Sequence, residues 1–78
     1  MFDRILDIYN ANRGDKPRIT KKILAEKFEY EELTTSYQYG RKLMDAVDSG
    51  KQLRINYRIL KYTAELLGIS MDKLFNQF

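Results

Sequence analysis

The strongest constraint on the fold lies in the last third of the chain, where residues 56–78 read NYRILKYTAELLGISMDKLFNQF. Asn56 is a residue type that caps helix N-termini. The residues after it place a largely apolar stripe on one helical face: Ile59, Leu60, Thr63, Leu66 and Leu67. Gly68 can adopt the left-handed conformation that ends a helix, and Ser70 can cap a second helix with its own apolar stripe, formed by Met71, Leu74, Phe75 and Phe78. The sequence therefore predicts two helices joined by a sharp corner.

Two further helices are expected in the first half of the chain. The first spans roughly residues 2–12 and ends before a turn-forming cluster that contains Pro17, since proline cannot continue a helix. The second follows Thr20, which serves as its N-cap. With the two C-terminal helices and a central one, the expected fold class is all-α, a single domain of five helices over residues 1–78.

The central helix is expected to begin near Thr34 or Thr35, because Thr35 and Gln38 match a capping box, and to end at Gly50. Gly40 lies in its middle, where glycine costs about 1 kcal/mol relative to alanine. Three explanations stay open: close contact with the second helix, close approach to a phosphate backbone, or a break before a shorter helix that starts at Arg41. The spacing predicts an inward face formed by Tyr37, Gly40, Met44 and Val47, with Leu43 at its border.

Composition restricts the function. The chain has 78 residues and contains no cysteine and no histidine, so thiolate metal sites and the commonest neutral-pH proton carrier are missing. It has no glycine-rich phosphate loop, and no run of apolar residues approaches the length of a membrane span. We therefore expect neither an enzyme nor a metal or cofactor site, no membrane association, and a cytoplasmic location.

Three segments resemble the lambda-repressor-like helix-turn-helix family, the Cro and repressor group of XRE type. The family's closing pattern, LxxLAxxLGVSxxxLF, matches Leu60, Ala64, Leu67, Gly68, Ile69, Ser70, Leu74 and Phe75. Residues 19–28 look like its first motif helix, and residues 44–50 are similar to the end of its recognition helix and the following glycine turn. The chain departs from the family at residues 29–39, which are longer than the usual turn and have Glu29 where the family has glycine.

The resemblance implies a small sequence-specific transcriptional regulator, of phage or mobile-element type, that binds double-stranded DNA as a homodimer with its third helix in the major groove. The outward face of that helix supplies base-contact candidates, because arginine and lysine match guanine and glutamine can bind adenine: Gln38, Arg41, Lys42 and Asp45. The basic residues at the start of the second helix and after Gly50 supply phosphate-contact candidates: Lys21, Lys22, Lys51, Gln52 and Arg54. The net charge of +3 is compatible with this partner.

An alternative function is a protein-protein interaction module, such as an antirepressor or adaptor, on the same helical scaffold. The acidic, tyrosine-bearing segment 29–39 motivates it, since carboxylates near a duplex repel phosphate. Tyrosine and phenylalanine bring large contact areas, so the interface candidates are Tyr30, Tyr39 and Phe78. If Glu31 and Glu32 lay on one continuous face with Arg41 and Lys42, this alternative would be favoured.

Overall fold

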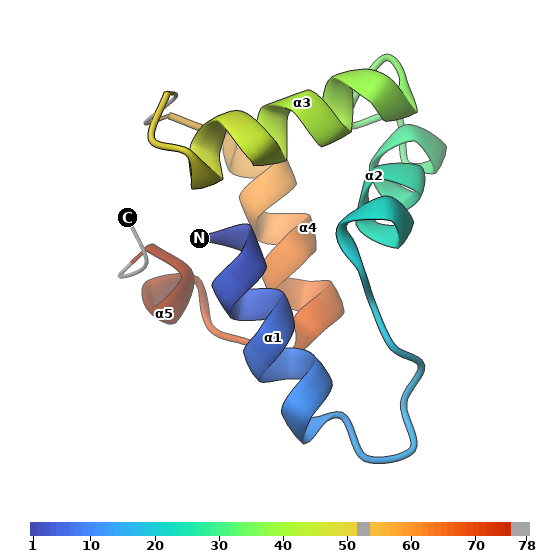
Figure 1. Ribbon diagram of the computed structural model, residues 1–78, viewed down its shortest axis with the longest axis vertical. Coiled ribbons are helices and arrows are strands. Elements are labelled where there is room, and N and C mark those ends of the chain that lie inside the picture. Colours follow the sequence, from blue (N-terminus) through green and yellow to red (C-terminus); the bar gives the residue numbers. More distant parts are fainter. Residues whose placement is uncertain (52–53, 76–78) are drawn as a thin grey trace.

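A computed structural model describes residues 1–51 and 54–75 of the protein. Within these ranges the chain is helical and has no strand, and its elements are α1 (Phe2–Asn12), α2 (Lys21–Tyr30), α3 (Tyr37–Asp48), α4 (Tyr57–Leu67) and α5 (Met71–Phe75). Figure 1 shows α3 lying across one end of the molecule, while α1 and α4 run roughly at right angles to it. For the residues that the structure describes, the expectation of an all-α chain of five helices is confirmed.

All five helices contribute to one core. Its largest fully buried apolar side chains come from four of them: Phe2, Leu24, Phe28, Met44 and Leu74. Phe28 also makes an edge-to-face contact with Tyr62 of α4, with 6.0 Å between ring centroids. Thr63 is fully buried too, and its hydroxyl donates to the Ile59 carbonyl (2.8 Å), so this polar group is satisfied.

The inward face predicted for α3 agrees with the structure, since the buried residues of this helix are Gly40, Leu43, Met44 and Val47. Tyr37 is half-buried at the edge of the core. In α4 the predicted stripe is buried except for Leu66, which is half-buried.

Three of the predicted N-caps are confirmed. The Thr20 hydroxyl accepts from the Ile23 N–H, the Asn56 side chain from the Arg58 N–H, and the Ser70 hydroxyl from the Lys73 N–H. Each cap satisfies a backbone donor that a helix leaves unpaired at its start. Local sequence signals therefore place the starts of α2, α4 and α5 correctly.

The predicted start of α3 is wrong, and so is the alternative start at Arg41. The cap is Ser36, whose hydroxyl accepts from the Tyr39 N–H (3.1 Å), while the Glu29 carboxylate accepts from the Tyr37 N–H (3.2 Å). Thr34 is instead buried, and its hydroxyl donates to the Ser36 carbonyl (3.0 Å). The connection between α2 and α3 is therefore residues 31–36, shorter than the sequence suggested.

Three helices end with the same hydrogen-bond pattern. Beyond α2, α3 and α4, a backbone N–H donates to the carbonyl five residues earlier: Leu33 to Phe28, Lys51 to Ala46 and Ile69 to Ala64. This Schellman motif needs a left-handed residue just before the donor. That residue is Gly50 after α3 (φ +77°) and Gly68 after α4 (φ +68°), but Glu32 after α2 (φ +58°). Glu29, where the family has glycine, lies inside α2.

Replacing Glu32 by glycine should therefore stabilise the fold. Side chains with a Cβ are strained in the left-handed region, so Glu32→Gly should raise the free energy of unfolding by about 1 kcal/mol, measured by urea denaturation. Glu31→Gly is the matched control, because it removes the same charge at a residue with φ −84° and should bring no gain. Equal effects of the two substitutions would contradict this account.

Gly40 allows α2 and α3 to approach closely. A Cβ built on Gly40 would lie 3.5 Å from the Cβ of Ala25 and 3.5 Å from the Thr34 hydroxyl oxygen. Of the three explanations for this glycine, these distances support close contact with the second helix, where Gly40 faces Ala25. The distances are ordinary van der Waals contacts, so a single added methyl group fits, but a branched side chain does not.

The two substitutions at this position should have opposite effects. Gly40→Ala should raise the free energy of unfolding by up to about 1 kcal/mol through helix propensity, since the new methyl group makes no clash. Gly40→Val should lower it by about 1 to 3 kcal/mol, because its Cγ atoms would push Ala25 away. Thermal unfolding followed by circular dichroism measures both, and a Gly40→Val protein as stable as Gly40→Ala would contradict the close approach.

Candidate nucleic-acid interface

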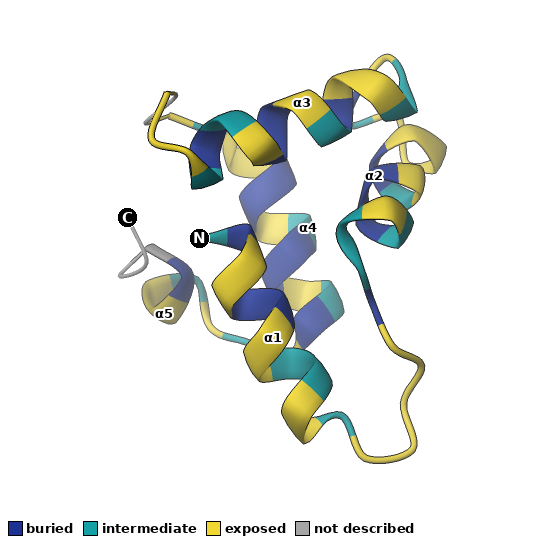
Figure 2. Cartoon of the chain, in the orientation of Figure 1, coloured by how far each residue is buried: buried dark blue, intermediate teal, exposed yellow. Residues whose placement is uncertain are grey.

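The outer side of α3 carries the residues predicted to face away from the core. Gln38, Lys42 and Asp45 are exposed, whereas Arg41 is half-buried. Figure 2 shows exposed residues along the side of α3 that faces away from the other helices. The helix therefore presents polar side chains to solvent, with its basic residues, Arg41 and Lys42, in the N-terminal half and Asp45 in the C-terminal half.

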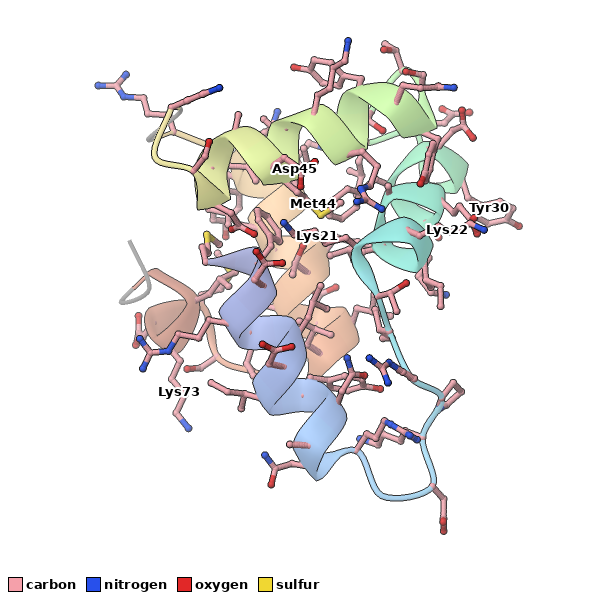
Figure 3. The ribbon with its side chains drawn as sticks, viewed as in Figure 1. Lys21, Lys22, Tyr30, Met44, Asp45 and Lys73 are labelled. Carbon is pink, nitrogen blue, oxygen red and sulfur yellow. The ribbon has the colours of Figure 1, made fainter. Side chains whose placement is uncertain are left out.

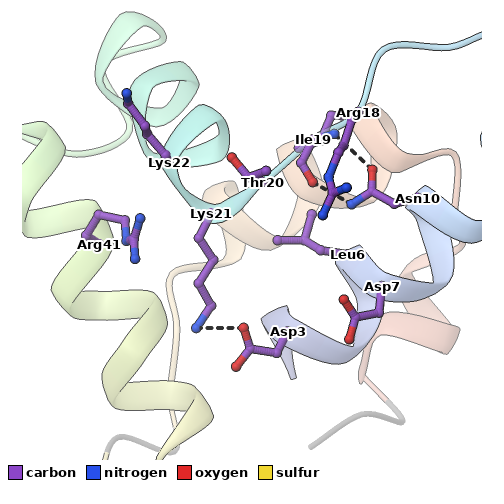
Figure 4. Close-up of a pocket in the computed structure, with 10 residues that line it drawn as sticks. All are labelled: Asp3, Leu6, Asp7, Asn10, Arg18, Ile19, Thr20, Lys21, Lys22 and Arg41. Atoms are coloured by element: carbon purple, nitrogen blue, oxygen red, sulfur yellow. Dashed lines mark hydrogen bonds and ion pairs between the residues drawn. The ribbon is translucent and has the colours of Figure 1, made fainter.

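Arg41 lies beside the start of α2. Figure 4 shows its guanidinium directed toward Lys21 across a groove of about 300 Å³ between α1, α2 and α3. The groove is lined by four cationic side chains and two carboxylates: Arg18, Lys21, Lys22, Arg41, Asp3 and Asp7. Lys22 is exposed next to it. The structure thus brings base-contact candidates of α3 close to phosphate-contact candidates of α2.

Lys21 has a different environment from the other cations. Its ammonium group contacts three carboxylates, with Nζ–O distances of 3.1 Å to Asp3, 3.0 Å to Asp45 and 2.6 Å to Asp48. Its side chain is only 14% exposed. Burial acts to lower the pKa of Lys21, but the three carboxylates outweigh burial and hold that pKa above its ordinary value. Two residues predicted to contact DNA, Lys21 and Asp45, therefore contact each other (Figure 3).

Asp48 is the centre of this ion-pair network. Its carboxylate accepts the first backbone N–H groups of α1, from Phe2 (2.6 Å) and Asp3 (3.0 Å), and also contacts the amino group of Met1 (3.0 Å). It therefore caps α1, although it is the last residue of α3. Burial acts to raise the pKa of this carboxyl, but the hydrogen bonds from Lys21 and the α1 start outweigh burial and hold the pKa well below its ordinary value.

Three of the remaining phosphate-contact candidates lie on the surface. Lys22, Lys51 and Arg54 are exposed, and Gln52 lies outside the described residues. Lys51 directly follows the left-handed Gly50 that ends α3, so it sits at the opposite end of α3 from Gln38.

The predicted interface tyrosines are exposed, Tyr30 by 84% and Tyr39 by 52%. Phe78 lies outside the described residues. Tyr57, 61% exposed, is a large surface aromatic that the sequence did not single out.

Glu31 and Tyr30 line a groove with Tyr62 of α4. Burial of the Tyr62 hydroxyl and the nearby charge of Glu31 both raise the pKa of Tyr62. Glu31 and Arg41 therefore line different grooves.

Sequence reasoning missed Asp48. One local signal was present, because a carboxylate at the C-terminal end of a helix opposes the helix dipole and so suggests a partner elsewhere. Its partners lie far away in sequence, at the start of α1 and at Lys21, and no local pattern identifies them.

Comparison of the chain with protein-family models, with curated proteins and with solved structures found no match. Over residues 1–51 and 54–75, no group of three or more acidic, cysteine or histidine side chains could hold a metal ion. None of the helices in these ranges is long and apolar enough to cross a bilayer.

Removing the Asp48 charge should destabilise the protein at neutral pH. Asp48→Asn keeps the side-chain shape but leaves Lys21 and the start of α1 with a weaker acceptor, so the free energy of unfolding should fall by about 2 to 3 kcal/mol. Asp15→Asn, at an exposed residue of the loop after α1, should change it little. Urea denaturation at pH 7 measures both variants.

The effect should depend on pH in a defined direction. Because the pKa of Asp48 is lower in the folded than in the unfolded state, its stabilisation is present above about pH 4 and is lost as the pH falls further. The stability difference between wild type and Asp48→Asn should therefore shrink on acidification below that value. A difference that stays constant from neutral to acidic pH would exclude the ion-pair explanation.

Proposed function

We propose that the protein binds double-stranded DNA through the exposed face of α3 and acts as a small transcriptional regulator of helix-turn-helix type. The observation that carries this proposal is the surface formed by Gln38, Arg41 and Lys42, with Lys22 beside it on α2. Side chains of these types recognise base edges and phosphates. The family resemblance of the sequence supports the same function.

The dimensions of α3 suit a major groove. Its 12 residues correspond to a length of about 18 Å, and the major groove is about 12 Å wide. Recognition helices of helix-turn-helix proteins contact bases mainly through their N-terminal residues. Gln38, Arg41 and Lys42 lie in the N-terminal half of α3, whereas Asp45 and Asp48 lie in the other half and bind Lys21. We therefore assign base contacts to the N-terminal half.

Phosphate contacts are assigned to the exposed cations at either end of this surface, Lys22 at the start of α2 and Lys51 and Arg54 beyond α3. Each phosphate that such a cation neutralises makes the affinity depend more steeply on salt. Lys21 is assigned a structural role, because its charge is balanced by three carboxylates. Binding as a homodimer stays a prediction of the family resemblance.

Two alanine substitutions should separate base contacts from phosphate contacts. Arg41→Ala should weaken binding to the preferred sequence by about 1 to 3 kcal/mol and relax the preference at one base pair. Lys51→Ala should weaken binding to all sequences alike and reduce the slope of log K against log salt by about 1. Selection from a random duplex library, followed by a salt titration in fluorescence anisotropy, measures both effects.

Arg4→Ala is the matched control, because Arg4 is an exposed cation of α1 that lines none of the grooves described above. It should leave both the affinity and the preferred sequence unchanged. Failure of the wild type to bind any duplex at low salt would reject the proposal. An Arg41→Ala protein with unaltered affinity and preference would reject the assignment of bases to α3.

A second candidate function is protein binding through the end of α2. It is favoured by Tyr30, whose side chain is 84% exposed and lines a groove with Glu26 and Glu31. Such a surface suits a partner with basic residues and an apolar contact area. This function requires no affinity for duplex DNA, so the same binding measurement distinguishes the two candidates.

A further inference from the structure

A second surface lies beside the loop between α1 and α2, at the end of the molecule away from α3 (Figure 1). It is a groove of about 330 Å³ with an apolar floor that includes Tyr9, Ile23 and Leu66. Three cationic side chains, Lys16, Arg18 and Lys27, line it as well. We call this surface the loop groove. We propose that it docks a short acidic segment of a protein partner, with an apolar side chain of that segment on the floor.

The charge of the loop groove favours an acidic occupant. No carboxylate is among its lining residues, and none of its three cations forms an ion pair with another residue of the described ranges. Lys16 and Arg18 are exposed, and Lys27 is half-buried against the floor. Three cations that form no ion pair within the described ranges, around one small apolar surface, are complementary to carboxylates that flank an apolar side chain.

The wall of the loop groove is held in place before any partner binds. The Tyr9 hydroxyl donates to the Pro17 carbonyl (3.3 Å), and the Asn10 side chain both donates to the Ile19 carbonyl (2.7 Å) and accepts from the Ile19 N–H (2.9 Å). Arg13 closes the turn by donating to the Lys16 carbonyl (2.8 Å). Because the loop is already ordered, a partner loses little free energy in shaping the site.

The apolar floor favours a peptide over a nucleic acid. A duplex backbone could approach the lysines and the arginine, but its phosphates and sugars would leave the half-buried faces of Tyr9, Ile23 and Leu66 without an apolar partner. A leucine or phenylalanine of a peptide would cover them, and its burial would add to the charge contacts. Peptide grooves commonly combine apolar anchors with charged edges in this way.

The neighbouring surface sets the direction of the peptide. The groove that contains Tyr30 and Tyr62 adjoins the loop groove, since Ile23 and Lys27 line both. That neighbouring groove is also lined by the carboxylates Glu26 and Glu31. Carboxylates of the peptide would be repelled there, so they should contact Lys16, Arg18 and Lys27 from within the loop groove and not extend past Lys27. This requirement makes the site selective for acidic sequences rather than for any amphipathic segment.

The test uses a fluorescein-labelled peptide of about 12 residues, with leucine at every third or fourth position and glutamate between, and measures anisotropy against the full chain. Binding should weaken by about tenfold for Lys16→Glu and for Lys27→Glu, because each substitution places a carboxylate against the peptide. Arg4→Glu makes the same charge change outside the groove and should bind like wild type. Circular dichroism melting checks that every variant folds.

A charge exchange makes the test decisive. The peptide with lysine in place of glutamate should not bind wild type, but it should bind the double variant Lys16→Glu with Lys27→Glu. Rescue of this kind cannot come from unfolding, and Arg4→Glu, which lowers the net charge outside the groove, should not produce it. Equal binding of the glutamate peptide to wild type and to the double variant would overturn the proposal.

A duplex competitor distinguishes this proposal from the proposed function. Unlabelled DNA should not displace the peptide, because none of the side chains assigned to DNA contacts lines the loop groove: Lys22, Gln38, Arg41, Lys42, Lys51 and Arg54. Arg18 lines both the loop groove and the groove beside Arg41, so Lys16→Glu is used to detect direct competition. Displacement by DNA that Lys16→Glu abolishes would assign the groove to nucleic acid and overturn the proposal. If the protein binds the peptide but binds no duplex, the loop-groove proposal stands and the proposed DNA-binding function is rejected.

Discussion

The contact between Asp48 and Lys21 fixes how the first three helices meet. Each charge is unfavourable within its own helix, because a carboxylate ends α3 and an ammonium group begins α2, so both oppose the helix dipoles. Together they compensate each other, and Asp48 also accepts the first N–H groups of α1. One carboxylate at the end of α3 thereby binds the starts of two other helices. The close contact of Gly40 with Ala25 positions α3 on α2 toward its other end.

This arrangement decides which residues remain for a partner. Lys21 and Asp45 are used within the fold, while Gln38, Arg41 and Lys42 occupy the half of α3 that the ion pairs do not reach. At the end of α2, Glu31 lines a groove with Tyr62 and with no residue of α3. This carboxylate therefore does not share a groove with the cations of α3. No residue of α3 lines the loop groove, so a protein partner could bind there without covering α3, although Arg18 lines both that groove and the groove beside Arg41.

The sequence predicted the features that depend on neighbouring residues. The bounds of α1, the caps at Thr20 and Asn56, and the left-handed glycine after α4 all follow from signals a few residues apart. The same signals misplaced the start of α3, because Ser36 competes with nearby threonines and the Glu29 carboxylate helps to decide the outcome. Helical spacing also predicted the exposure of Gln38 and Lys42. It could not predict the partners of Asp48, which are 45 and 46 residues away in α1.

The most direct test of the central claim, that the N-terminal half of α3 lies against DNA, is an NMR titration of the ¹⁵N-labelled chain with a duplex of about 20 base pairs. The largest shifts should fall on the Gln38 side-chain amide, the Arg41 Nε–H and the backbone of Lys22, with little change at Tyr62. Shifts centred on Tyr30 and Tyr62, with Gln38 and Arg41 unmoved, would contradict it.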